Sequence, residues 1–221
     1  MRLILFFSLF LLSGCYLKSP KVDILKPSYR MLNFSYDSKY LSYDSDYNVL
    51  IPPPRNEKDF YLLKDKAKSG DSDSNLLMFK LFYKDSNCNY FSFGNIKSDF
   101  ICAKAIDYLI DSVNSNPNNN LALYEMSKLY YNGIVLERND NKAMGILDRI
   151  IKKGGRNAVL VCDYLVEITL FDDDRNIKDL DKARYYANIG AENGSEKCQK
   201  YHDDIDSYMN NKRKNRGLYG K

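Results

Sequence analysis

Few residues of this chain have the types and spacings that carry catalysis. Its 221 residues include one histidine, His202, and a lone histidine is more often a surface or packing residue than a base or metal ligand. The acidic run at residues 172–174 could hold a hard cation, but a solvated loop is the simpler interpretation. Cys162 would need a low-pKa thiolate to act with His202, and its place in an apolar helix face argues against that. We therefore expect a protein that is not an enzyme, with no catalytic, metal or cofactor site.

Cys15 is the residue to which the sequence does assign a chemical role. It follows a charged start at Arg2 and an apolar run at residues 3–12, a pattern typical of a secretory signal peptide. The run is too short for a membrane span, which needs about 20 residues. The sequence Leu-Ser-Gly-Cys at residues 12–15 resembles the lipobox of bacterial lipoproteins. That resemblance implies removal of residues 1–14 and a lipid thioether on Cys15. A plain secretory leader with a chance cysteine is the alternative.

A lipidated Cys15 predicts where the protein resides. Several acyl chains would anchor it stably, because each buried methylene contributes about 0.8 kcal/mol. In bacterial lipoproteins an aspartate after the lipidated cysteine implies retention at the inner membrane, and Tyr16 stands at that position here. The resemblance therefore implies a periplasmic protein that its lipid anchors to the outer membrane.

Both ends of the mature chain differ in composition from its middle. Residues 15–56 contain most of the prolines, including the run at 52–54, and they predict an extended tether. Residues 210–221 form a basic tail without acidic residues. The net charge of +4 falls to +3 without Arg2, and residues 15–211 then sum to −2, which argues against a nucleic-acid-binding domain. The tail could contact anionic lipid or an acidic protein patch, or it could be solvated.

An internal repeat of 36 residues, from Ala122 to Ala158, predicts helices in pairs. Small and large residues follow Ala122 at the spacing of a buried helix face, and Gly133 has the position of a helix C-cap. Asn139 suits the N-cap of a second helix, which Gly154 ends. The apolar stripe expected on that second helix comprises Ala143, Ile146, Leu147, Ile150 and Ile151.

The central repeat resembles the Sel-like repeat, a relative of the tetratricopeptide repeat. The matching residues are Ala122, Met126, Ser127, Tyr130, Gly133, Lys142, Ala143, Gly154 and Ala158. The resemblance implies an all-α fold, namely an α/α solenoid of about three to four helix pairs over residues 57–209. The flanking repeats depart from the pattern, with Thr169 where glycine is usual and Phe79 where a small residue is usual. A generic helical bundle with accidental spacing is the alternative.

Four cysteines follow Cys15, and in an oxidising compartment they predict disulfides. Cys88 and Cys102 would close the long loop of the first repeat. Cys162 and Cys198 occupy similar positions on successive first helices, which a solenoid places side by side. The first pair is the more favoured of the two. Four buried free thiols are the alternative, because cysteine also packs as a small apolar residue.

The predicted function is protein binding, since stacked helix pairs expose a long surface. Three positions of each first helix should point away from the packed stripe, and tyrosine among charges there is typical of binding hot spots. The candidate contact residues are Lys80, Tyr83, Tyr124, Lys128, Tyr131, Tyr164 and Glu167. Small lipid-anchored repeat proteins resemble immunity proteins against type VI phospholipase effectors, which implies an inhibitor of a periplasm-targeted toxin. An envelope scaffold that organises wall or stress-response proteins is the alternative. Neither interpretation requires nucleic acid or a small-molecule substrate.

Overall fold

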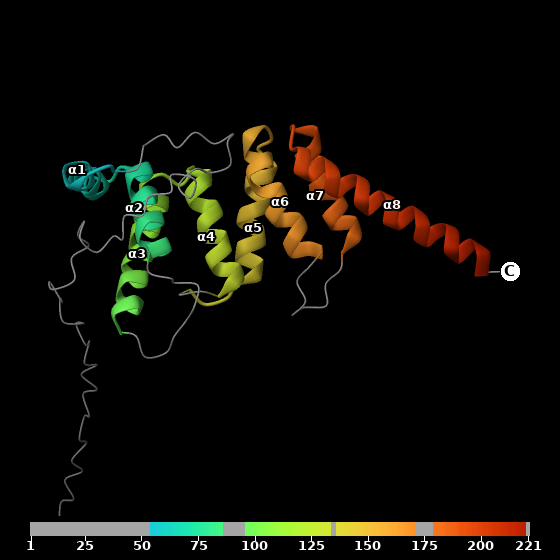
Figure 1. Ribbon diagram of the computed structural model, residues 1–221, viewed down its shortest axis with the longest axis horizontal. Coiled ribbons are helices and arrows are strands. Elements are labelled where there is room, and N and C mark those ends of the chain that lie inside the picture. The colour runs from blue at the N-terminus through green and yellow to red at the C-terminus, as the bar shows by residue number, and fades with distance from the viewer. Residues whose placement is uncertain (1–53, 86–95, 134–135, 171–178, 220–221) are drawn as a thin grey trace, which may run out of the picture.

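The computed structural model describes residues 54–85, 96–133, 136–170 and 179–219. Within these ranges the chain forms eight α-helices and no strand, which confirms the all-α fold class for this part of the protein (Figure 1). The helices are α1 (Glu57–Lys68), α2 (Ser72–Asp85), α3 (Ile96–Ser115), α4 (Asn120–Asn132), α5 (Asp140–Ile151), α6 (Arg156–Leu170), α7 (Leu180–Glu192) and α8 (Glu196–Tyr219). The predicted leader and nearly all of the predicted tether lie outside the described residues.

The helices follow one another in chain order along the molecule (Figure 1). Extensive contacts join α2 to α3, α4 to α5 and α6 to α7, so these consecutive helices form three hairpins, and α7 has a similarly extensive contact with α8. Helix α1 packs against α2 at one end of this series of hairpins, and α8 packs against α7 and α6 at the other end. Each hairpin therefore contacts chiefly its neighbours in sequence.

Local sequence signals account for the ends of α4 and α5. The side chain of Asn119 accepts a hydrogen bond from the backbone N–H of Ala122 and caps the start of α4. Gly133 ends α4 with φ of 66°, a left-handed conformation that glycine adopts without strain. The side chain of Asn139 accepts from the N–H of Lys142 and begins α5. The caps predicted at Gly133 and Asn139 are both confirmed.

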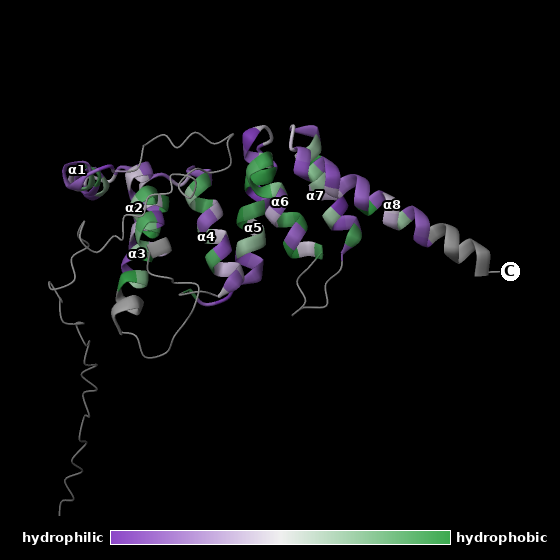
Figure 2. Ribbon diagram, in the orientation of Figure 1, coloured by the Kyte–Doolittle hydropathy of each residue, from purple (hydrophilic) through white to green (hydrophobic). Residues whose placement is uncertain are grey.

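Apolar residues of the repeat pattern form the core, and Figure 2 shows them concentrated on α2 to α6. Buried residues form two clusters, one over α1 to α4 and the other over α4 to α8. Of the five residues expected in the stripe of α5, Ala143, Leu147, Ile150 and Ile151 are fully buried, and Ile146 is partly buried. The helical period thus places the same side of each helix toward the core.

Polar side chains join successive hairpins at one end of the helices. Asn120 Nδ2 donates to Asn157 Oδ1 over 2.7 Å, which links the start of α4 to the start of α6. The N–H of Gly155, just before α6, donates to Asn193 Oδ1 at the end of α7 over 2.5 Å, a contact within the third hairpin. The contact between Asn120 and Asn157 joins neighbouring hairpins and fixes the starts of their first helices relative to each other.

Helix α8 is longer than the sequence predicts. The last helix runs to Tyr219, so most of the segment predicted as a separate tail from residue 210 continues α8. Among the described helices, none is both long enough and apolar enough to cross a lipid bilayer.

Candidate functional site

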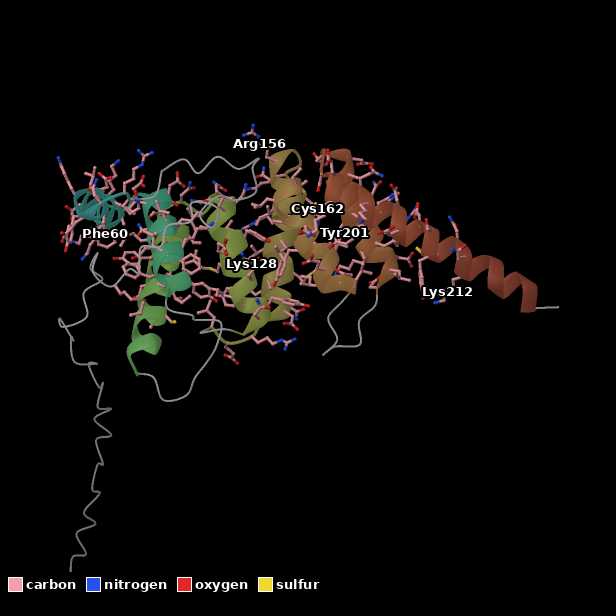
Figure 3. All side chains as sticks on the ribbon, in the orientation of Figure 1. Phe60, Lys128, Arg156, Cys162, Tyr201 and Lys212 are labelled. Carbon is pink, nitrogen blue, oxygen red and sulfur yellow. A yellow bond between two sulfur atoms is a disulfide. The ribbon has the colours of Figure 1, made fainter. Side chains whose placement is uncertain are left out.

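The candidate site is a row of polar and aromatic side chains on α2, α4, α6 and α8, the first helices of the hairpins and the helix that follows them. We call it the first-helix row. It consists of Lys80, Tyr83, Tyr124, Glu125, Lys128, Tyr131, Asp163, Tyr164, Glu167, Lys197 and Tyr201. Figure 3 labels Lys128 on α4 and Tyr201 on α8, two members of this series. The row contains all seven residues predicted to contact a partner.

The contact between α2 and α4 places two lysines around one carboxylate. A side-chain oxygen of Glu125 lies 3.7 Å from Lys80 Nζ, and the other lies 2.6 Å from Lys128 Nζ. Lys80 and Glu125 are mostly shielded from water, with 16% and 13% of their side chains exposed. Burial lowers the pKa of Lys80 to about 8, and the attraction of Glu125 offsets only part of this effect. With both lysines protonated, the three groups sum to one positive charge.

Tyr83 lies beside this contact on α2. Its ring packs against that of Phe79, with centroids 5.0 Å apart. Burial raises the pKa of Tyr83 to about 12, and the negative charge of Glu125 acts in the same direction. The Tyr83 phenol therefore stays neutral at ordinary pH.

Three tyrosines form the middle of the row, between α4 and α6. The ring of Tyr164 meets those of Tyr124 and Tyr131 edge to face, at centroid distances of 5.9 and 6.0 Å. The Nζ of Lys128 lies 4.5 Å from the centroid of the Tyr124 ring. Burial raises the pKa of Tyr124. These contacts hold the rings in fixed orientations before any partner binds.

Tyr131 corrects the expectation that all seven candidates point away from the packed surface. It is only 8% exposed, and its hydroxyl donates to the carbonyl of Ile168 over 3.3 Å. The residue faces α6 because the neighbouring hairpin covers this part of α4. Tyr131 therefore acts in the packing of adjacent hairpins, whereas the side chains of Lys128 and Glu167 are partly exposed.

The contact between α6 and α8 reverses the arrangement between α2 and α4. Here one lysine, Lys197, lies 2.5 Å from Asp163 Oδ2 and 3.3 Å from Glu167 Oε1. Tyr201 donates a hydrogen bond to the same Glu167 oxygen over 3.1 Å. Burial alone would lower the pKa of Lys197, but the two carboxylates outweigh it and raise that pKa. Two carboxylates and one ammonium sum to one negative charge.

Four members of the row were not predicted from the sequence. Glu125, Asp163, Lys197 and Tyr201 do not occupy the repeat positions chosen as outward-facing. Their one sequence signal is adjacency: Glu125 follows Tyr124, and Asp163 precedes Tyr164. Pairing between different helices has no local signature, which is why Lys80 and Glu125 could not be matched in advance.

The structure describes three of the five cysteines. Cys162 and Cys198 are joined in a disulfide between α6 and α8, and both residues are fully buried. Cys102 is also disulfide-bonded. Its predicted partner Cys88 and the predicted lipidation residue Cys15 lie outside the described residues.

Of the residues considered for catalysis, Cys162 is held in the disulfide with Cys198 and so has no free thiol. His202 lies on α8 beside Asp203 and Asp206, at 3.6 and 3.9 Å. The acidic run at residues 172–174 lies outside the described ranges. Over the part of the chain that the structure describes, no group of three His, Cys, Asp or Glu side chains could hold a metal ion.

A hollow of about 680 Å³ lies apart from the row, between α1 and α3. Lys64, Lys68, Lys104, Tyr108 and Asp111 are among the residues that line it. None of the predicted contact residues takes part in it. The hollow and the first-helix row are therefore separate surfaces.

Comparison of this chain with known proteins finds no relative. The fold class and the first-helix row are therefore the features that characterise it. Neither protein-family descriptions nor curated proteins nor solved structures yield a match to this chain.

Proposed function

We propose that the hairpins form a Sel-like solenoid whose first-helix row binds another protein. The disulfide between Cys162 and Cys198 is the observation that carries this proposal. These residues are 36 positions apart, which is the repeat length in the sequence, and they lie on α6 and α8. A stack of repeats places equivalent positions of successive first helices side by side, and such a placement allows this bond to form.

The geometry of the row supports binding of a protein surface. Its aromatic middle is flanked by a positive contact between α2 and α4 and a negative contact between α6 and α8. Tyrosines held by neighbouring rings lose little side-chain entropy when a partner covers them, which favours affinity. The opposite charges would orient the partner along the row.

The proposed partner is a toxin that acts in the periplasm, and the proposed role of this chain is to inhibit it. The leader and lipobox at residues 1–15 would hold the inhibitor at the outer membrane, where such a toxin arrives. A Cys15→Ser chain should then fail to incorporate labelled palmitate, whereas the unaltered chain should incorporate it. Equal labelling of the two chains would contradict the anchor.

Inhibition is tested with any candidate toxin that is found encoded beside the gene. Cells that produce such a toxin in the periplasm should survive when they also produce the full chain. Lys128→Ala and Glu167→Ala should weaken toxin binding on the order of tenfold, because each removes a partly exposed member of the row. Lys152→Ala removes an exposed lysine that is not part of the first-helix row and should leave binding unchanged.

Two results would contradict the inhibitor. One is full toxin activity in the presence of the purified chain for every neighbouring toxin. The other is an envelope defect on deletion of the gene in cells that meet no toxin, which would favour the scaffold that the sequence leaves as an alternative. The palmitate experiment is independent of both results.

A further inference from the structure

Helix α8 leaves the body of the protein partway along its length. Tyr201, Ile205, Tyr208 and Lys212 follow one another at helical spacing and so share one side of α8. Ile205 is 5% exposed and packs in the body, whereas Tyr208 is 55% exposed. Figure 1 shows the helix continuing outward beyond α7. The side chain of Tyr208, one turn beyond the buried Ile205, is therefore exposed where α8 leaves the body.

Charge changes sign at the same point. Residues 196–206, which contact the body, contain four acidic and two basic side chains. Residues 207–219 contain no acidic side chain and four basic ones, Lys212, Arg213, Lys214 and Arg216. The projecting half also carries Tyr208, Met209, Leu218 and Tyr219. One helix thus joins a mixed-charge half that packs in the body to a cationic half that begins with the exposed Tyr208.

We propose that the projecting half of α8 binds an anionic lipid surface, with Tyr208 at the boundary between headgroups and acyl chains. Basic residues near such a surface each raise affinity about fivefold, and tyrosine is enriched at membrane interfaces. The contact is separate from the first-helix row and from the lipid proposed at Cys15. It would give the anchored protein a second attachment and set how the row lies relative to the membrane.

The charge distribution favours lipid over an acidic protein. Successive residues on a helix are about 100° apart, so the four basic positions are spread over more than half of the circumference of α8. A specific acidic protein patch would contact one side of the helix and leave the other charges unpaired. The field of an anionic bilayer acts on every charge within about 10 Å of it at ordinary salt, so all four contribute.

Vesicles of defined composition test the proposal with the mature chain carrying Cys15→Ser, which cannot be acylated. It should co-sediment with vesicles of phosphatidylcholine and phosphatidylglycerol, but not with phosphatidylcholine alone, and less as salt rises. The variant K212Q/R213Q/K214Q/R216Q should bind on the order of several hundredfold more weakly. The control K58Q/K66Q/K152Q/R156Q removes four exposed positive charges elsewhere and should bind as the parent chain does.

Fluorescence reports the place of contact, because the chain contains no tryptophan. In Tyr208→Trp the new indole should shift its emission to shorter wavelength on vesicles that contain phosphatidylglycerol. In Tyr61→Trp, at the exposed surface of α1, the emission should not move. Circular dichroism of every variant establishes that the helices remain.

Three results would overturn the proposal. The first is no binding of the folded chain to phosphatidylglycerol vesicles at physiological salt. The second is equal loss of binding in the control variant, which would assign the effect to net charge alone. The third is binding to polyglutamate, or self-association in sedimentation equilibrium, without any binding to vesicles. None of these depends on a toxin, so the proposed inhibition can fail while this proposal stands.

Discussion

Gly190 on α7 lies directly against the disulfide that joins Cys162 to Cys198. A Cβ atom added at Gly190 would lie 2.6 Å from the Cβ of Cys162 and 2.7 Å from that of Cys198. Atoms of packed side chains do not approach so closely, and the two cysteines are fixed by their bond and by full burial. Helix α7 can pack between α6 and α8 only because residue 190 has no side chain.

Gly190→Ala should therefore destabilise the protein by about 1 to 3 kcal/mol, since a buried methyl group would force the helices apart. Gly145→Ala on α5 is the matched control, because a Cβ there meets no atom within 4 Å. It should stabilise the protein by about 0.5 to 1 kcal/mol through its better helix propensity. Urea unfolding measures both changes, and equal effects of the two substitutions would contradict the packing described.

Loss of the disulfide should lower the free energy of unfolding by about 4 kcal/mol, because the bond closes a loop of intermediate length and restricts the unfolded chain. Cys162→Ala/Cys198→Ala removes it without leaving an unpaired thiol. The expected result is a lower urea midpoint and easier proteolysis of α8. Unchanged stability in this variant would show that the bond does not constrain the folded protein in solution.

The buried ammonium of Lys80 predicts a pH dependence of stability. Its pKa is lowered to about 8 from an ordinary value of 10.5 in the unfolded chain. Between these two values the unfolded chain binds more protons, so this group makes the free energy of unfolding rise with pH from about 8 to 10.5. Lys80→Met should remove that rise.

The comparison for Lys80 is Lys66→Met on the exposed surface of α1. The difference in free energy of unfolding between Lys80→Met and the parent chain should be largest near neutral pH and shrink toward pH 10.5. At neutral pH the variant should exceed the parent in stability, because it lacks the buried ammonium while Lys128 still neutralises Glu125. A difference that is constant over this pH range would show that Lys80 keeps its ordinary pKa.

The hydroxyl of Tyr186 joins α7 to α5, donating to Asp148 Oδ1 over 2.6 Å. Tyr186→Phe should cost about 1 to 2 kcal/mol, because the acceptor is charged and the ring is 1% exposed. Tyr130→Phe is the control, since its hydroxyl accepts from the exposed ammonium of Lys142. Thermal unfolding of both variants should show a clear decrease in midpoint for Tyr186→Phe alone.

The helices were predictable in detail where local chemistry specifies them. Gly133 and Asn139 mark the end of α4 and the start of α5, and the stripe of α5 follows the helical period. Residue 57, predicted as the start of the folded part, is the first residue of α1. The prediction failed at α8, where a cluster of basic residues was taken for the end of the helix, although lysine and arginine are good helix formers.

The candidate site was predictable only as a set of positions. Lys80, Tyr124, Lys128, Tyr164 and Glu167 do lie in one row, because the repeat places them at similar positions on successive helices. Their partners were not predictable, since Glu125 and Lys197 belong to no repeated pattern. Tyr131 was misjudged because its exposure depends on how far α6 covers α4.

The sequence by itself determined that the described chain is helical, where α4 ends, where α5 begins and which residues form the apolar face of α5. These properties depend on interactions within about one turn of a helix, such as caps and the 3.6-residue period. Only the tertiary structure decided that Lys80 meets Glu125, that Lys197 meets Asp163 and that Gly190 covers a disulfide. Those contacts depend on the rotation and offset between neighbouring hairpins, which arise from the packing of whole faces rather than from any single residue.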